Sequence, residues 1–336
     1  MSSQVILSGF ADEAALDKTI DQQFAAMAAL GLDYLSIRFI DAGNGIRNVL
    51  DLDASEMSLV QARLRDYGLS ISSIGSPIGK VKVADFDDGT NNRFVPFADY
   101  LTGEVLAACD AAEKLQCRLI RGFSFYHPRD TDYRPWLSQA SDYLGQIADV
   151  CESRGLTFGV EVEANLIGHT GDILAEIHRS LSHPALTLVF DSGNLVTQGF
   201  SPNQILAQFS AMLPGLGWMH VKDYLSEQAA ANTQGGYVDE DALDRFVPAD
   251  MGSGNHVEVF RLLGKHLPQI IARLQQRDVP GFFVELEPHL RGGGQFGGFS
   301  GPDGMGVALR ALTEVLAGAG IDFQIRNFAS MRTSAS

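Results

Sequence analysis

Short apolar segments alternate along the chain with longer segments whose apolar residues recur every three or four positions. The short segments are typical of buried strands, and the longer ones of helices with one buried face. Eight strands are predicted in this way, at residues 5–10, 33–39, 69–75, 117–125, 156–163, 186–191, 217–223 and 281–287. The helical spacing is clearest in 16–30 and 260–274, and a last helical segment, 306–320, follows the eighth strand.

Strands that alternate with helices predict crossover connections and a parallel sheet. Eight units with a helix after the last strand match a closed (β/α)8 TIM barrel better than an open sheet. We therefore predict an α/β fold with one domain over residues 1–336. Several helical segments end at a glycine just before the next strand, as at Gly31, Gly68 and Gly155, which suits the left-handed residue past a helix end.

One connection is much longer than the others. Residues 224–253, between the seventh strand and its helix, are rich in Asp, Gln and Gly. A connection of this length is usually functional or mobile, and in a barrel it lies on the face that carries active sites. We expect a substrate lid here; a solvated insertion or a contact between subunits is the alternative.

Charged side chains gather at the ends of the last four predicted strands. They are Glu161 and Glu163, Asp191, His220 and Lys222, and Glu285 and Glu287. In a strand, residues two apart face the same side, so each pair forms a row. Carboxylates this close together would raise one another's pKa, and a bound divalent cation removes that cost. An oxygen-rich set with one imidazole suits Mn²⁺ or Mg²⁺, with Co²⁺ as a further candidate.

Composition and net charge indicate which kinds of molecule the protein can bind and where in the cell it is expected. The chain is 45% apolar and 20% charged, as in ordinary soluble proteins, and its net charge of −16 argues against nucleic acid and anionic lipid. The three cysteines, Cys109, Cys117 and Cys151, sit in apolar segments and are expected to be buried thiols in a reducing cytoplasm. The N-terminal sequence is unlike a signal peptide, and no apolar run is long enough for a membrane helix.

Six stretches of the chain resemble the sugar phosphate isomerase/epimerase family, the xylose isomerase-like TIM barrels. They are GFADEAALD (9–17), ISSIGSPIGKV (71–81), RLIRGFSFYHP (118–128), VFDSGNLVTQG (189–199), HVKDY (220–224) and ELEPHLRGGGQFGGFSGP (285–302). The resemblance implies one metal ion bound by residues from strands 5 to 8: Glu163, Asp191, His220 and Glu287. Glu161 and Glu285 are the reserve ligands, and Glu285 is otherwise expected to lie one layer deeper and to hold a neighbour by hydrogen bonding.

The resemblance also implies a chemistry. A sugar isomerase or epimerase of this kind removes a proton next to a metal-polarised carbonyl of a ketose, aldose or related sugar and passes through an enediolate. Glu163 and Glu287 are then the acid/base residues, with Lys222 and His289 as second candidates. The candidates for substrate binding are Lys80, Arg121, His127, Asn165, Arg38 and Arg291. Lys80 could instead be a solvated lysine, and Arg121 a salt-bridge partner at the barrel end.

The chain departs from the family at three places. Asn165 and Asn194 stand where many members or related ketose epimerases have histidine, and residues 224–244 lack an arginine that those epimerases carry. Some relatives cleave 3-keto glycosides by elimination with the same metal and base, so a lyase is the alternative reading.

Three other classes of protein fit the sequence less well. A metal-free glycoside hydrolase would need two carboxylates but neither His220 nor Asp191. A DNA-repair endonuclease would need a three-zinc cluster and would suffer from the negative charge. In a non-catalytic sugar-binding barrel, four candidate metal ligands at the ends of four strands would not be expected. We therefore expect a cytoplasmic enzyme that acts on a small sugar or sugar derivative. The sequence is compatible with either a monomer or a homo-oligomer.

Overall fold

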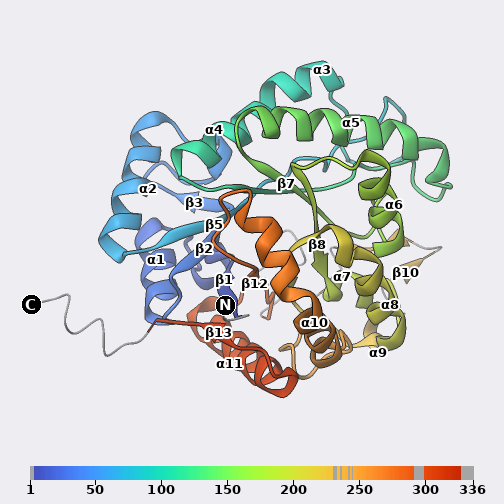
Figure 1. The fold of residues 1–336 in the computed structure, drawn as a ribbon. Coiled ribbons are helices and arrows are strands. Elements are labelled where there is room, and N and C mark those ends of the chain that lie inside the picture. Colours follow the sequence, from blue (N-terminus) through green and yellow to red (C-terminus); the bar gives the residue numbers. More distant parts are fainter. Residues whose placement is uncertain are drawn as a thin grey trace, which may run out of the picture.

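Eight parallel strands lie side by side in the centre of the molecule, and helices surround them (Figure 1). The computed structural model describes residues 4–229, 233–234, 237–240, 243, 245–290 and 299–326. In barrel order the strands are β1(Val5–Gly9), β12(Phe283–Leu286), β9(Leu216–Val221), β8(Leu186–Asp191), β7(Thr157–Glu161), β6(Leu119–Gly122), β5(Ser70–Gly75) and β2(Tyr34–Ile37). A parallel bridge between Phe10 and Ser36 joins the β1 side to the β2 side. The predicted TIM barrel and its eight strands are confirmed.

The helices follow the strands as the apolar spacing predicts. Those of the described residues are α1(Ile20–Ala29), α2(Ala54–Tyr67), α3(Phe97–Tyr100), α4(Leu106–Lys114), α5(Arg134–Ser153), α6(Gly171–Leu181), α7(Ser192–Val196), α8(Pro202–Met212), α9(Ser226–Ala229), α10(His256–Gln275) and α11(Gly301–Ala319), with short η1(Ala11–Ala14), η2(Val49–Asp51), η3(Leu101–Val105) and η4(Leu213–Gly215). Every one of these helices is too short or too polar to cross a membrane.

The ends of α2 show how local sequence sets the boundaries of a helix. Asp53 accepts hydrogen bonds from the first backbone N–H groups, and Glu56 bonds back to the Asp53 N–H, which completes a capping box. At the other end Gly68 adopts a left-handed φ of 61°, which glycine tolerates without steric cost. The prediction that this glycine ends a helix is confirmed.

Five short strands were not predicted from the sequence. Two of them, β3(Phe39–Asp41) and β4(Ile46–Asn48), form a hairpin after β2, while β13(Phe323–Gln324) pairs with β1. The other two, β10(Thr233–Gln234) and β11(Tyr237–Val238), form a hairpin within the long connection between β9 and α10. Elements of two or three residues carry too few side chains to produce a periodic pattern. The long connection is confirmed, and its use as a lid stays a prediction.

The barrel interior is packed closely enough to predict one strong effect on stability. Gly159 in β7 lies against the buried indole of Trp218 in β9, and a Cβ at position 159 would lie 2.1 Å from an indole carbon. We expect Gly159→Ala to lower the free energy of unfolding by about 1–3 kcal/mol because the indole has no room to move away. Chemical denaturation measures this change.

The matched control is Gly318→Ala near the end of α11. Apart from its chain neighbours and the backbone of its own helix, no atom lies within 4 Å of the added Cβ there. Alanine also favours a helix over glycine by up to about 1 kcal/mol. We expect unchanged or higher stability for this variant. Equal unfolding curves for the two variants would contradict the packing described for the barrel interior.

Candidate metal centre

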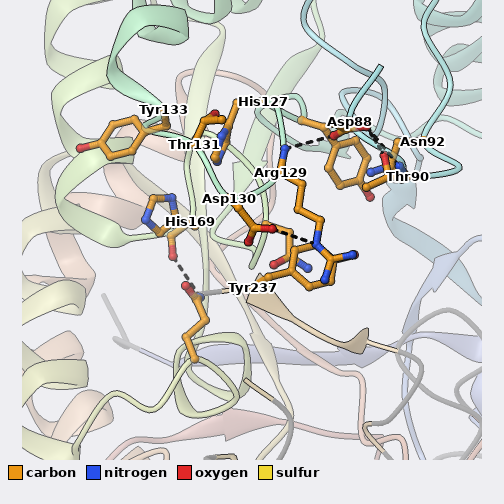
Figure 2. Close-up of a pocket in the computed structure, with 13 residues that line it drawn as sticks. Asp88, Thr90, Asn92, His127, Arg129, Asp130, Thr131, Tyr133, His169 and Tyr237 are labelled. Atoms are coloured by element: carbon orange, nitrogen blue, oxygen red, sulfur yellow. Dashed lines mark hydrogen bonds and ion pairs between the residues drawn. The ribbon is translucent and has the colours of Figure 1, made fainter. Parts of the chain in front are cut away.

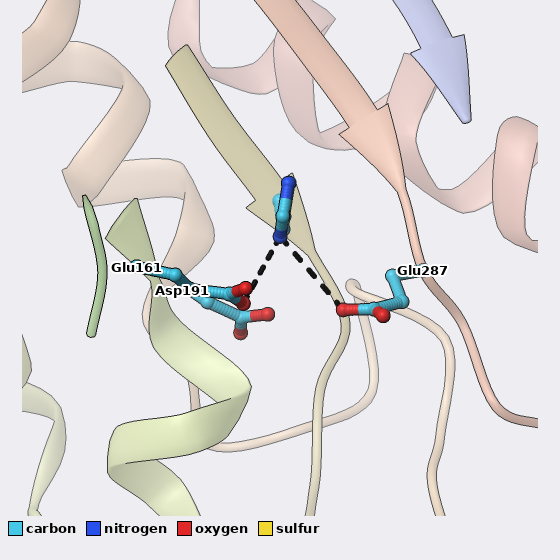
Figure 3. Close-up of side chains that lie close together, drawn as sticks. Glu161, Asp191 and Glu287 are labelled. Carbon is cyan, nitrogen blue, oxygen red and sulfur yellow. Dashed lines mark hydrogen bonds and ion pairs between the residues drawn. The ribbon is translucent and has the colours of Figure 1, made fainter. Parts of the chain in front are cut away.

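Four neighbouring strands bring three carboxylates and one imidazole together at their C-terminal ends. Glu161 and Asp191 are the last residues of β7 and β8, His220 lies near the end of β9, and Glu287 follows β12. All four side chains are buried, and one ligand atom from each lies within 4.8 Å of the others. Figure 3 shows the carboxylates around the imidazole, whose Nδ1 lies 3.0 Å from Glu161 Oε1 and 3.8 Å from Glu287 Oε2.

Glu163, the residue that the sequence analysis chose from strand 5, lies outside this group. Its carboxylate faces Lys80 instead, with 3.2 Å between Oε2 and Nζ. The reason is that β7 ends at Glu161 and the chain then turns, with Asn165 at a left-handed φ of 63°. The two-residue alternation that predicted one row of side chains stops at Glu161, so the reserve residue takes the place beside His220.

Glu285 lies one layer deeper, as expected. Its carboxylate accepts hydrogen bonds from the Ser72 and Ser73 hydroxyls and lies 3.2 Å from His220 Nε2. Nε2 of His220 thus lies on the Glu285 side, where the Trp218 indole N–H also donates to it at 3.3 Å, and Nδ1 faces the other carboxylates. Outer carboxylates commonly orient metal-binding histidines in this way.

Three buried cations balance the carboxylates. Lys222 Nζ lies 3.3 Å from both Asp191 Oδ2 and Glu287 Oε2, and Arg38 Nη1 donates to Glu287 Oε1 at 2.8 Å. Arg121 Nε lies 3.4 Å from Glu161 Oε2, so the salt-bridge reading of Arg121 has a basis in the geometry.

These charges displace the pKa values of the group. Burial alone would raise the pKa of Glu287, but Lys222, His289 and Arg38 hold it well below its usual value. Burial alone would lower the pKa of His220, but Glu161 and the other carboxylates raise it to about 10. Burial raises the pKa of Asp191 to about 7 against the opposing effect of Lys222.

The four side chains suit a divalent cation. Asp191 Oδ2 is buried and has no hydrogen-bond partner, although Lys222 lies within ion-pair distance. An orphaned carboxylate oxygen beside two further carboxylates and an imidazole is the environment that a hard or borderline divalent ion satisfies. This group of buried acidic residues and histidine can therefore hold a metal ion.

A second group of buried residues shares Glu287 with the first. His289 donates its backbone N–H to Glu13 Oε2 at 2.8 Å, and its Nδ1 lies 2.9 Å from Glu13 Oε1. Arg38 joins this group through Asp12, with 3.1 Å between Nε and Oδ2. Asp12 and Glu13 were missed by the sequence analysis, although they follow β1 directly and so lie at the same end of the barrel as the other strand ends.

The candidates for substrate binding divide between two cavities. A cavity of about 70 Å³, the inner cavity, opens at the metal centre. Its charged lining residues are Arg38, Lys80, Arg121, Glu161, Glu163 and Glu287. His127 and Asn165 instead line a cavity of about 250 Å³, the outer cavity (Figure 2). Arg291 lies outside the described residues.

Comparison with known proteins identifies related sequences and folds. The sequence profile described as xylose isomerase-like TIM barrel matches residues 24–315. No curated protein matches the chain.

Three solved structures, each less than 20% identical to the chain, share its fold. One is a xylose isomerase-like TIM barrel protein from Mycobacterium smegmatis in complex with magnesium, with 17% identity, a TM-score of 0.59, and 95% of this chain and 98% of that chain covered. A second is D-psicose 3-epimerase from Clostridium cellulolyticum, with 13% identity, a TM-score of 0.57 and coverage of 94% and 99%. A third is 3-keto-D-glucoside 4-epimerase from E. coli, with 12% identity, a TM-score of 0.57 and coverage of 93% and 99%.

Proposed function

The chain belongs to the xylose isomerase-like TIM barrel family, and we propose that it is a metal-dependent isomerase or epimerase of a ketose, aldose or related sugar. One observation carries the proposal: four barrel strands bring three buried carboxylates and an imidazole within 4.8 Å of one another. Sugar epimerases among the proteins of the same fold, and a magnesium complex of another, support it.

We assign the metal to Glu161, Asp191, His220 and Glu287, so that Glu161 replaces Glu163 in the set expected from the sequence. The oxygen-rich donors favour Mn²⁺ or Mg²⁺, with Co²⁺ as a third candidate. When bound, such an ion supplies Lewis-acid polarisation of a sugar carbonyl and stabilises the enediolate that forms after proton loss.

Proton transfer is assigned to Glu163 and Glu287. Both line the inner cavity, and they reach it from different strands, since β8 and β9 lie between β7, which Glu163 follows, and β12, which Glu287 follows. One carboxylate can remove the proton beside the carbonyl, and the other can return a proton to the opposite face. Lys222 and His289 are buried and lie 3.3 and 4.0 Å from Glu287, so we assign them to holding its charge and orientation.

The inner cavity also supplies groups that bind a polyhydroxylated substrate. Lys80, Arg38 and Arg121 line it, and each has a carboxylate partner within 3.4 Å. A substrate hydroxyl can share these donors without leaving a charge unpaired. Small-molecule sugars or their derivatives are the proposed partners; cytoplasmic location, the lack of nucleic acid binding and homo-oligomerisation stay predictions.

A lyase that eliminates the aglycone of a 3-keto glycoside is the second candidate. It would use the same metal residues and the same base. The outer cavity, about 250 Å³ at the same end of the barrel as the metal centre, favours this reaction because it offers space in which an aglycone could lie. The two reactions differ in their products, since only the lyase releases the aglycone.

A sugar panel tests the proposed function. The protein is stripped with a chelator, reloaded with Mn²⁺, Mg²⁺ or Co²⁺, and incubated with ketoses, aldoses and 3-keto glycosides, with products read by NMR. Turnover that requires the ion is the expected result. A sugar hydrolase activity that persists in the chelator would contradict it and favour a pair of carboxylates acting without metal.

Metal binding is expected to release protons and to strengthen as the pH rises. Metal ligands must be deprotonated, whereas the raised pKa of about 10 keeps His220 protonated at neutral pH without metal. The apparent metal affinity should therefore rise about tenfold per pH unit between pH 7 and 9, with a steeper rise below pH 7, where Asp191 also holds a proton. Titration calorimetry in buffers of different ionisation enthalpy measures the protons released, and an affinity that does not change from pH 7 to 9 would refute this expectation.

A further inference from the structure

The outer cavity lies at the same end of the barrel as the metal centre but uses different residues. Its volume is about 250 Å³. Its walls come from the loops that follow β5, β6, β7 and β8, together with Tyr237 of β11. Figure 2 shows Tyr133, His127 and His169 on one side and Arg129 near Tyr237 on the other. None of the four residues assigned to the metal lines it.

Residues that are close together on the same loops line the outer and the inner cavity. Asn165 lines the outer cavity, while Glu163, two residues earlier on the same loop, lines the inner one. Similarly, Tyr126 lines the outer cavity and Phe123, three residues earlier, lines the inner one. Asn165 Nδ2 also donates to Glu240 Oε1 at 3.2 Å, which attaches the long connection to this wall. The same two loops therefore contribute residues to both cavities, which places the outer cavity beside the site of the reacting sugar.

The outer cavity presents neutral imidazoles. Burial lowers the pKa of His127 and of His169, so both rings are uncharged at neutral pH. Nδ1 of His127 lies 3.1 Å from Pro128 O, and Nδ1 of His169 lies 3.0 Å from Leu166 O. A carbonyl needs a donor, so each Nδ1 carries the proton and each Nε2 is left as an acceptor. Two such acceptors suit hydroxyl donors of a ligand.

Aromatic rings and uncommitted polar groups complete this lining. The Tyr133 ring contacts both imidazoles edge to face, with ring centroids 6.4 Å from His127 and 5.2 Å from His169. Tyr126 and Asn92 also line the cavity, and among the described residues neither side chain has a hydrogen-bond partner. Binding sites of small molecules typically combine apolar and aromatic walls with a few polar groups of this kind.

The charges of the cavity argue against an anionic ligand. Among the described lining residues, Arg129 is the only lysine or arginine. Its Nε lies 3.5 Å from Asp130 Oδ2, and its guanidinium lies 4.1 Å from the centre of the Tyr237 ring. The carboxylate of Asp88 adds negative charge, balanced by Lys82 at 3.0 Å. Among the described residues that line the cavity, a phosphate would therefore meet only a cation that already has a carboxylate partner.

We propose that the outer cavity binds a second, uncharged polyhydroxylated ring of the substrate. The sugar that reacts at the metal centre then arrives as a disaccharide or other glycoside, not as a free monosaccharide or a sugar phosphate. This inference rests on the proposed function for the identity of the reacting ring, but the affinity of the outer cavity for a second ring is independent of turnover.

Binding without turnover tests the inference. Cellobiose, maltose, trehalose, glucose and glucose 6-phosphate are titrated into the metal-free and the Mg²⁺-loaded protein, and dissociation constants are measured by ligand-observed NMR. At least one disaccharide should bind about tenfold more tightly than glucose and glucose 6-phosphate. Equal affinity for one and two rings, or tightest binding of the phosphate, would overturn the inference. Failure of the proposed function would instead appear as absent metal or absent turnover, with this preference retained.

A double variant tests whether the preference for a disaccharide over glucose arises in the outer cavity. Tyr126→Phe with His127→Phe keeps both rings and removes one hydroxyl and one imidazole acceptor from the cavity. The preference for a disaccharide over glucose should fall about tenfold, as expected for two lost hydrogen bonds. The matched control is Tyr34→Phe with His183→Phe, since both residues lie at the opposite end of the barrel, at or before strand starts. A preference kept in the first variant, or lost in the control, would overturn the assignment to this cavity.

Discussion

Replacing Glu287 by glutamine is expected to remove the metal ion and with it the activity. Glu287 contacts more of the charged groups of the site than a single ion pair would require. Arg38 Nη1 lies 2.8 Å from its Oε1, and its Oε2 faces Lys222 Nζ and His220 Nδ1. Glutamine keeps the shape but loses the charge that binds the ion. We expect metal affinity to fall by more than about 100-fold and kcat/KM by at least about 1000-fold, measured by metal titration and by turnover of the sugar identified in the panel.

Glu285→Gln is the control for this prediction. It makes the same chemical change two residues away, at a carboxylate that bonds Ser72 and Ser73 and contacts only the far side of His220. Loss of an outer partner of this kind typically costs about 10- to 100-fold in metal affinity, and we expect the low end of that range, so most of the metal is kept at saturating ion. A full metal complement in Glu287→Gln, with loss in Glu285→Gln, would show that the two residues have been exchanged.

The second large effect is a difference between two variants: Glu161→Gln is expected to lose metal affinity, whereas Glu163→Gln is expected to keep the metal and lose turnover. Glu161 lies in the group around His220, so its variant should lose metal affinity by more than about 100-fold. Glu163 faces Lys80 in the inner cavity, so its variant should bind metal within about tenfold of the original protein. Its turnover should nevertheless fall by about 100- to 10,000-fold because a positioned acid/base group is lost.

Metal titration and turnover of the same preparations separate the two roles. Circular dichroism on heating shows whether either variant has lost its fold, which matters because both carboxylates are buried. Metal loss in Glu163→Gln with full retention in Glu161→Gln would return the ligand role to the residue that the sequence analysis first chose.

The barrel could be predicted from the sequence because its signal is repeated. Each strand between helices is a weak indication, but eight of them in order leave few other folds, and all eight were found. The helix ends were also readable where one residue decides them, as Gly68 does with its left-handed φ of 61°. The hairpins of two- and three-residue strands, such as β10 and β11, were not readable because they depend on pairing and not on periodicity.

The site was predictable as a set of strand ends, but not to the residue. Asp191, His220 and Glu287 lie together because parallel strands end at one edge of the barrel. The choice between Glu161 and Glu163 depended on where β7 stops, and a strand end can shift by two residues without changing the apolar pattern. The turn at Asn165, with its φ of 63°, ends the strand alternation and so separates Glu163 from Glu161. A single asparagine in the sequence is not enough to predict such a turn.

Contacts between distant segments were beyond the sequence. Glu13 reaches His289, and Arg38 reaches Glu287, across more than 200 residues of chain. The division of the candidate residues between two cavities is of the same kind, since Lys80 and His127 both follow barrel strands and nothing in their spacing separates them. Only the folded chain places Lys80 in the inner cavity and His127 in the outer cavity.

Elemental analysis by inductively coupled plasma mass spectrometry tests the central claim most directly. The purified, tag-free protein is incubated with Mn²⁺, Mg²⁺ or Co²⁺, desalted and measured beside Glu287→Gln treated in the same way. We predict close to one ion per chain in the original protein and almost none in the variant. The absence of any bound divalent ion in the original protein under every loading condition would contradict the metal centre, and with it the proposed isomerase.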